Sequence, residues 1–293
     1  MITSKDISVL LPCQCNEALI YSALESLNWH NQNHKLQVLV GMHNCSLSNA
    51  FLAYTNLSFD KLSIKYVRVN TDDGLPCVLN TLWEHADNQY LMRMDDDDLS
   101  LPSRLKITLN AVNFAPDAAI YGFSYYYCKP LEFPNQIILP KRFHDDPRRA
   151  LIYGVPFAHP TIVINRCKIR SKYDNYFKYA QDYCLYVDNI EAYFLYTKFP
   201  VLAYSAPKYI GYLSGKRIKQ LTYHDLILKR LFSRLGLTVN LSFTRSIRQE
   251  FITDEDKIIY PCNPKFNSHE FFYNAIRLLN QFLLLNPPIG SNK

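Results

Sequence analysis

The sequence predicts an α/β protein in which a sheet is flanked by helices and is followed by a helical C-terminal region. Three observations predict this fold class. Apolar, β-branched runs alternate with segments of helical periodicity from residue 7 to residue 114. The 293-residue chain is 48% hydrophobic and 20% charged, a balance that can bury a core. From residue 214 the pattern becomes helical, so we divide the chain into a domain of residues 1–213 and a basic, mainly helical region of residues 214–293.

The first part of the chain reads as successive βαβ units. Such units place their strands in parallel, so the first four strands are expected to form one parallel sheet. The expected strands are Ile7–Leu11, Gln37–Val40, Ser63–Val69 and Tyr90–Met94, and the helices between them are Ala18–Trp29, Ala50–Leu57 and Leu75–Ala86.

The second part mixes strands, helices and one long loop. Ser103–Phe114 and Tyr179–Asn189 read as helices, and Ala118–Tyr127 and Thr161–Ile164 as strands. The Pro-rich, charged stretch Lys129–Arg149 predicts a flexible loop.

Two helices are expected in the C-terminal region. Thr222, with Asp225 three residues later, is typical of a capping box that starts a helix ending at Gly236. A last helix is expected over Ser268–Leu285, before two prolines.

We expect neither export nor membrane insertion of the chain. Met1–Asp6 lacks the apolar run of a signal peptide, and no stretch approaches the ~20 apolar residues that span a bilayer. The eight cysteines are scattered and contain no CxxC pair, which predicts free thiols in a reducing compartment. We therefore expect a cytoplasmic protein.

Positive charge is concentrated in residues 214–248. This segment holds eight Lys or Arg and one acidic residue, Asp225, while the whole chain has a formal charge of +6. Such a segment could rest on an anionic membrane surface or meet a phosphorylated acceptor. The alternative is an ordinary solvated helix face. We expect no nucleic-acid partner.

Four consecutive aspartates, Asp95–Asp98, follow the predicted strand Tyr90–Met94. In open α/β sheets, ligands bind at the carboxyl ends of strands. Like charges this close repel one another unless a cation neutralises them, and carboxylate oxygens suit Mg²⁺ or Mn²⁺. The alternative is that an acid such as Asp98 only caps the next helix. One acid would suffice for a cap, so the run favours a metal site that holds a diphosphate.

Several segments resemble glycosyltransferase family 2, whose members have the GT-A fold, a Rossmann-like mixed sheet flanked by helices. Tyr90–Leu105 is similar to the family's DxD region. The other similar segments appear in the family's order and cover about residues 7 to 190: Ser8–Pro12 with Asn16-Glu17, Ala23–Leu27, Gly74–Pro76 with Leu79-Asn80, Ala158–Thr161 and Gln181–Leu185.

The resemblance implies an inverting, metal-dependent enzyme that moves a sugar from a nucleotide-diphosphate donor, with UDP expected, to a glycan or lipid-linked acceptor of a surface polysaccharide. Asp97 and Asp95 would hold Mn²⁺ or Mg²⁺, and Asp182 would be the catalytic base. His159 and Gln181 would lie on the acceptor side, although a lone histidine can equally be structural. The implied donor-binding residues are Pro12, Asn16, Glu17, His43, Asn80, Arg93, Asp95, Asp96 and Asp97.

The sequence departs from the family at two places on the donor side. The family's Asp pair after the second strand is replaced by Val40–Ser46, where His43 or Asn44 could substitute through a neutral hydrogen bond. The spacing from Pro12 to Asn16 is one residue longer than usual, with Cys15 in place of an aromatic residue. These departures leave two alternatives open: a degenerate domain that binds nucleotide or glycan without turnover, and a membrane-surface scaffold that uses residues 214–248.

Overall fold

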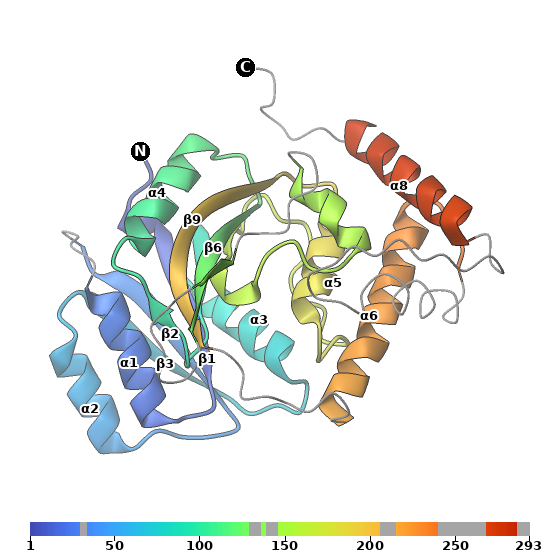
Figure 1. The fold of residues 1–293 in the computed structure, drawn as a ribbon. Coiled ribbons are helices and arrows are strands. Elements are labelled where there is room, and N and C mark those ends of the chain that lie inside the picture. The colour runs from blue at the N-terminus through green and yellow to red at the C-terminus, as the bar shows by residue number, and fades with distance from the viewer. Residues whose placement is uncertain (30–33, 129–135, 139–145, 206–214, 240–267, 286–293) are drawn as a thin grey trace.

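The structure is a computed structural model, and it describes residues 1–29, 34–128, 136–138, 146–205, 215–239 and 268–285. Within these ranges nine strands form one mixed sheet in the order β3-β2-β1-β4-β8-β6-β9-β5, with β7 paired to β6. Figure 1 shows the sheet at the centre, with α6 and α8 gathered at the side opposite α1 and α2. The predicted fold class is confirmed.

The first four strands are parallel, as the βαβ pattern predicts. They are β1 (Ile7–Cys13), β2 (Leu36–His43), β3 (Leu62–Val69) and β4 (Tyr90–Arg93). In the parallel registers, Val9 lies opposite both Val38 of β2 and Met92 of β4. The carboxyl ends of β1, β2 and β4 therefore meet at the same edge of the sheet.

The other half of the sheet contains antiparallel pairs. It consists of β5 (Leu99–Ser100), β6 (Ile120–Cys128), β7 (Gln136–Ile138), β8 (Val163–Asn165) and β9 (Phe194–Ser205). β8 is antiparallel to both β4 and β6, whereas β9 is parallel to β6. The sequence did not predict β9. Pro200 has no N–H to donate to the ladder, and the register shifts on either side of its partner Ser124.

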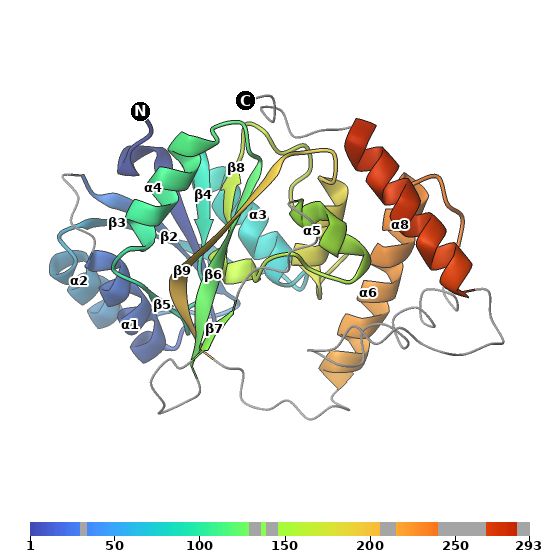
Figure 2. The same ribbon diagram turned by 45° about the horizontal axis from the view of Figure 1, so that its top comes forward.

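Helices cover both faces of the sheet. Figure 2 shows α1 (Glu17–Asn28), α2 (Asn49–Ser58) and α4 (Arg104–Phe114) on one face, and α3 (Leu75–His85) and α5 (Gln181–Asp188) on the other. The helices α6 (Gly215–Arg234) and α8 (Ser268–Leu285) lie outside α5.

The alternating side chains of β1 divide the core into two clusters. Ile7, Val9 and Leu11 pack with residues of α1 and α4, whereas Leu10 faces the cluster that contains α3 and α5. Apolar residues of α6 and α8 belong to this second cluster. The C-terminal helices thus pack against the same core that supports α5.

Three predictions about local structure are wrong. α6 begins at Gly215, so Thr222 and Asp225 lie inside the helix and do not form its N-terminal cap. Cys15 and Cys45, expected as free thiols, form a disulfide across 30 residues of sequence, a pairing that their separation hides. The predicted loop Lys129–Arg149 contains β7 and the start of a 3₁₀ helix, Pro147–Ile152, and its other parts lie outside the described residues.

Arg148 explains why the end of that predicted loop is ordered. Its guanidinium is buried, pairs with Asp146 at 2.7 Å, and donates to the carbonyl oxygens of Ile190 and Ala192. This contact ties the 3₁₀ helix to the segment after α5. Among the described helices, none is both long and apolar enough to cross a bilayer.

Candidate active site

The aspartate run lies where β4 ends. Met94 still donates to the Leu10 carbonyl of β1 at 3.1 Å, so the chain leaves the sheet immediately before Asp95. Carboxylate oxygens of Asp95, Asp97 and Asp98 all lie within 4.8 Å of one another. Asp97 is exposed, Asp95 is half-buried and Asp98 is buried. Three hard oxygen ligands at this spacing suit a divalent cation.

The electrostatics of the run point the same way. Burial, followed by repulsion from Asp95, raises the pKa of Asp97 above its ordinary value. Burial, followed by repulsion from Asp97 and Asp95, also raises the pKa of Asp96. Asp96 differs from the others because it accepts a hydrogen bond from the backbone N–H of Gln14 at 3.2 Å, and so connects the run to the loop after β1.

Buried arginines balance part of this charge. Arg93 is 1% exposed and its Nη2 pairs with Asp95 at 2.5 Å, while its Nε and Nη1 have no hydrogen-bond partner among the described residues. Arg104, at the start of α4, donates to the carbonyl oxygens of Arg93 and Pro160. Burial lowers the pKa of Arg104 to about 9, which leaves it charged at neutral pH beside the Asp98 carboxylate.

Asp182 is the second residue of α5, and its side chain is half-buried. Burial raises the pKa of Asp182 to about 6, against the opposing effects of the Tyr183 N–H, which donates to it at 2.9 Å, and of the Arg93 cation. The chain enters α5 through Ala180 in the left-handed conformation, with φ 59°. A carboxyl group with a pKa of about 6 is ionised at neutral pH and remains basic enough to accept a proton.

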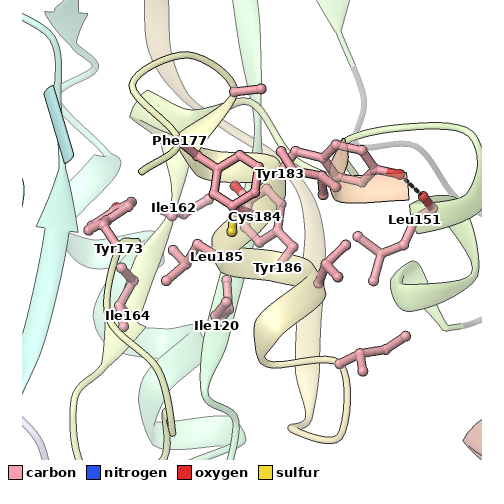
Figure 3. Close-up of a cluster of buried hydrophobic side chains, with 14 of the residues drawn as sticks. Ile120, Leu151, Ile162, Ile164, Tyr173, Phe177, Tyr183, Cys184, Leu185 and Tyr186 are labelled. Atoms are coloured by element: carbon pink, nitrogen blue, oxygen red, sulfur yellow. Dashed lines mark hydrogen bonds between the residues drawn. The ribbon is translucent and has the colours of Figure 1, made fainter. Parts of the chain in front are cut away.

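The core holds the position of α5 firmly. Figure 3 shows side chains of α5, including Tyr183 and Leu185, packed among Ile120, Ile164 and Leu151. The hydroxyl of Tyr183 donates to the Leu151 carbonyl oxygen at 2.5 Å. The residue next to Asp182 is thereby fixed on two sides.

His159 forms a buried pair with Tyr173. Its Nε2 lies 2.8 Å from the Tyr173 hydroxyl, and the rings are 5.5 Å apart in an edge-to-face arrangement. Burial, and then the Arg93 cation, lower the pKa of His159 well below its ordinary value, so the ring is neutral. Tyr173 lies outside the sequence motifs and 14 residues from His159, so no signal in the sequence identified it as the partner of His159.

Four of the predicted donor-binding residues hold the structure together. Pro12 is buried inside β1, and the Asn16 side chain caps α1 by accepting from the Leu19 N–H at 3.3 Å. Glu17 accepts from the N–H of Ser48, the N-cap of α2, at 2.7 Å. Asn80 of α3 donates to the Tyr173 carbonyl oxygen at 2.8 Å and accepts from its N–H at 3.2 Å.

The loops after β1 and β2 are joined directly. The Cys15–Cys45 disulfide links them, and the Nε2 of His43 lies 3.2 Å from the Thr71 carbonyl oxygen beyond β3. The side-chain amide of Asn44 both donates to and accepts from the backbone of Thr71, each at 2.8 Å. One N–H and one lone pair of this amide are therefore used within the protein.

The predicted residues thus divide into two groups. Arg93 is close enough to act electrostatically on Asp95, Asp98, Asp182 and His159, which places these groups in one neighbourhood. Asn16, Glu17 and Asn80 instead anchor loops around it, and Gln181 lies half-buried at the start of α5. The site combines a cluster of hard oxygen ligands with a separate carboxyl group poised to accept a proton.

Comparison with solved structures gives the fold a class. TarS of S. aureus, residues 1–349, is 14% identical, with a TM-score of 0.58 over 94% of this chain and 80% of that chain. The same protein in complex with UDP-GlcNAc is 13% identical, with a TM-score of 0.60 over 96% of this chain and 82% of that one. Mannosyltransferase PcManGT from Pyrobaculum calidifontis, in complex with GDP-Man and Mn²⁺, is 13% identical, with a TM-score of 0.52 over 98% and 88%. The chain has the GT-A glycosyltransferase fold.

The family follows from the sequence match. Residues 8–174 match the family model described as glycosyl transferase family 2. This match covers more than half of the chain, and the chain belongs to glycosyl transferase family 2. A search of curated proteins gives no match. The predicted family is therefore confirmed, while the donor, the acceptor and the stereochemistry are matters for proposal.

Proposed function

We propose that this protein is an inverting glycosyltransferase that uses a nucleotide-diphosphate sugar, with Asp182 as the catalytic base. One observation carries the proposal: a half-buried carboxyl group with a pKa of about 6 shares its electrostatic environment with the cluster of Asp95, Asp97 and Asp98. An acid-base group beside a cation site is what sugar transfer from a diphosphate requires.

The reaction follows from these positions. Asp182 accepts the proton of an acceptor hydroxyl while that oxygen forms a bond to the anomeric carbon of the donor. The bond from this carbon to the diphosphate oxygen breaks on the opposite face, so the configuration inverts. Because the transfer needs the ionised carboxylate, the rate falls as the pH drops below about 6.

The aspartate cluster suits Mn²⁺ or Mg²⁺. Asp95 and Asp97 would hold the ion, and the buried Asp98 completes an oxygen set whose members lie within 4.8 Å of one another. A bound cation would stabilise the negative charge that grows on the departing diphosphate. Arg93 holds Asp95 in place through their 2.5 Å pair, and Asp96 fixes the loop after β1 through Gln14.

The donor base is expected to meet His43. Since the Thr71 carbonyl oxygen can only accept, Nε2 of His43 carries the proton and Nδ1 keeps a lone pair. That lone pair can accept from the N3–H of uracil. A UDP-sugar is the proposed donor, and a glycan or lipid-linked acceptor in surface-polysaccharide synthesis is the proposed acceptor. TarS, one of the proteins with this fold, forms a complex with UDP-GlcNAc.

The test is a donor screen. Purified protein with Mn²⁺ or Mg²⁺ is incubated with UDP-, GDP-, CMP- and dTDP-sugars, and nucleotide release is measured for the unaltered protein, Asp97→Ala and the matched surface control Asp60→Ala. We expect metal-dependent release from a UDP-sugar that Asp97→Ala abolishes and Asp60→Ala retains. Binding of nucleotide sugars without any release, even with glycan acceptors present, would contradict turnover and support a degenerate binding domain.

Peripheral membrane contact through residues 214–248 has less support than the proposed enzyme activity. Residues 214 and 240–248 lie outside the described part of the chain. Within it, Arg230 pairs with Asp174 and Asp188, and Arg234 pairs with Asp188 and Glu191. Two of the basic side chains are therefore neutralised inside the protein, and exposed Lys219 and Lys229 remain. We propose a cytoplasmic location for the enzyme, although the Cys15–Cys45 disulfide removes free thiols as an argument for it. Binding to anionic vesicles would test the membrane contact.

A further inference from the structure

Three tyrosines gather on the surface beside α5. Tyr176 and Tyr179 precede α5, and Tyr223 lies on α6. The rings of Tyr179 and Tyr223 are stacked, with centroids 5.8 Å apart and an interplanar angle of 27°. The ring of Tyr176 meets that of Tyr223 edge to face at 6.0 Å. We call these three residues the tyrosine platform.

The platform is open to solvent and chemically mixed. Tyr176 is 63% exposed, which is unusual for so large a ring, and Tyr179 and Tyr223 are half-buried. Their hydroxyl groups have no hydrogen-bond partner among the residues that the structure describes. The surface therefore offers aromatic faces together with free hydroxyl groups.

The platform is also rigidly supported. Phe177, which is 3% exposed, lies beneath it with its ring 5.1 Å from Tyr176 and 5.7 Å from Tyr223. The Arg230 guanidinium lies 4.7 Å from the Phe177 ring and holds Asp174 at 3.0 Å and Asp188 at 2.7 Å. Because these contacts already hold the surface in place, it loses less conformational entropy when a ligand binds.

Its place in the fold connects it to the proposed catalytic base. Tyr179 and Tyr183 lie on either side of Asp182 in the sequence, and they contact consecutive residues of α6. Tyr179 stacks on Tyr223, and the Tyr183 ring lies 4.7 Å from that of His224. On its other side, Lys178 donates to the Asp72 carbonyl oxygen at 2.6 Å, next to the loop that leads into α3. The platform thus borders the segment that carries Asp182.

We infer that the tyrosine platform binds a sugar ring of the glycan acceptor. This inference rests on the proposed function. The C–H groups of one face of a pyranose pack against an aromatic ring, and its hydroxyl groups pair with tyrosine hydroxyls. None of the three residues carries a charge, so the platform suits a neutral sugar. All three lie outside residues 8–174, the part that matches the family model.

The experiment measures sugar binding by saturation-transfer NMR. The probes are methyl glycosides and disaccharides of glucose, galactose, mannose and N-acetylglucosamine. The full-length protein is compared with Tyr176→Ala, Tyr223→Ala and Tyr176→Phe. Tyr54→Ala is the matched control, because Tyr54 is 55% exposed on α2 and also packs against another tyrosine, Tyr21.

We expect saturation of the C–H protons of at least one probe. Each alanine variant in the platform should weaken the binding of that probe about tenfold, which equals about 1.4 kcal/mol. Tyr176→Phe should keep most of the affinity, and Tyr54→Ala should keep all of it. No saturation of any probe by the unaltered protein, or equal affinity in Tyr176→Ala, would overturn the inference. So would vesicle binding that depends on Tyr176 in the absence of sugar binding. Nucleotide release by the unaltered protein, measured separately, decides the proposed function.

Discussion

Replacing Asp182 by asparagine removes the charge at the start of α5 while keeping the shape of the side chain. The amide oxygen can still accept from the Tyr183 N–H, which lies 2.9 Å from the present carboxylate. We expect kcat to fall by roughly 10²–10⁴-fold, the usual contribution of a general base. The same substitution should make the folded protein more stable at neutral pH.

The gain in stability follows from the raised pKa. Burial raises the pKa of Asp182 from its ordinary 3.8 to about 6, so folding disfavours the ionised form by up to about 3 kcal/mol. Because the side chain is half-exposed, solvent screening reduces this value to about 1–2 kcal/mol. For a chain of this length, that corresponds to roughly 2–6 °C in Tm. The ionised carboxylate of Asp182 destabilises the folded protein above pH 6, and this effect disappears as the pH falls toward 4. The gain in Tm from Asp182→Asn should therefore disappear over the same range.

The assay is thermal unfolding at pH 7.5 and at pH 4.5, together with the rate of sugar transfer. Asp117→Asn is the control, because Asp117 is an exposed aspartate that pairs with Lys168 on the surface, and the substitution should change neither quantity measurably. A lower Tm for Asp182→Asn at pH 7.5 would refute the electrostatic reasoning. A transfer rate within about tenfold of the unaltered enzyme would refute the role of Asp182 as base.

Three further predictions follow from other contacts. Arg93→Met should move the acidic limb of the pH–rate profile to higher pH, because the Arg93 cation lowers the pKa of Asp182, the proposed base; an unmoved limb in any residual activity would contradict this. Gly122→Ala should lower the free energy of unfolding by about 1–3 kcal/mol in urea titration, because a Cβ there would come within 2.0 Å of the Phe157 ring. A Tm unchanged from that of the native protein would show that the ring can move aside. Reducing the Cys15–Cys45 disulfide, which closes 30 residues, should cost about 3 kcal/mol in the same titration, and no effect of a dithiol reductant would argue against a bonded pair.

Local patterns were sufficient to predict most of the elements in the first half of the fold. The four parallel strands and the helices between them follow from periodicity, because each strand is buried and each helix has one apolar face. β9 was missed because Lys198 and Pro200 interrupt its apolar pattern, although its partner β6 makes it a strand. The predicted cap at Thr222 is mistaken because α6 begins two turns before this local start signal.

The candidate site was predictable where its chemistry lies in consecutive residues, and less so where it depends on distant contacts. The aspartates after β4 and the carboxyl group of Asp182 could be named from their motifs. Their common link, the buried Arg93, depends on how β4 packs beside α5. The partner of His159 and the disulfide between Cys15 and Cys45 join segments whose separation in the sequence carries no signal.

The polar residues around the site explain why a motif can be matched and yet act indirectly. Asn16 caps α1, Glu17 accepts from the N–H of Ser48, the N-cap of α2, and Asn80 holds the backbone of Tyr173. Each satisfies backbone groups that would otherwise be left without partners at the edge of the sheet. The loops at this edge of the sheet are therefore shaped by these contacts. A substitution at Asn16 or Asn80 should then disturb the geometry of the site without removing a group that reacts.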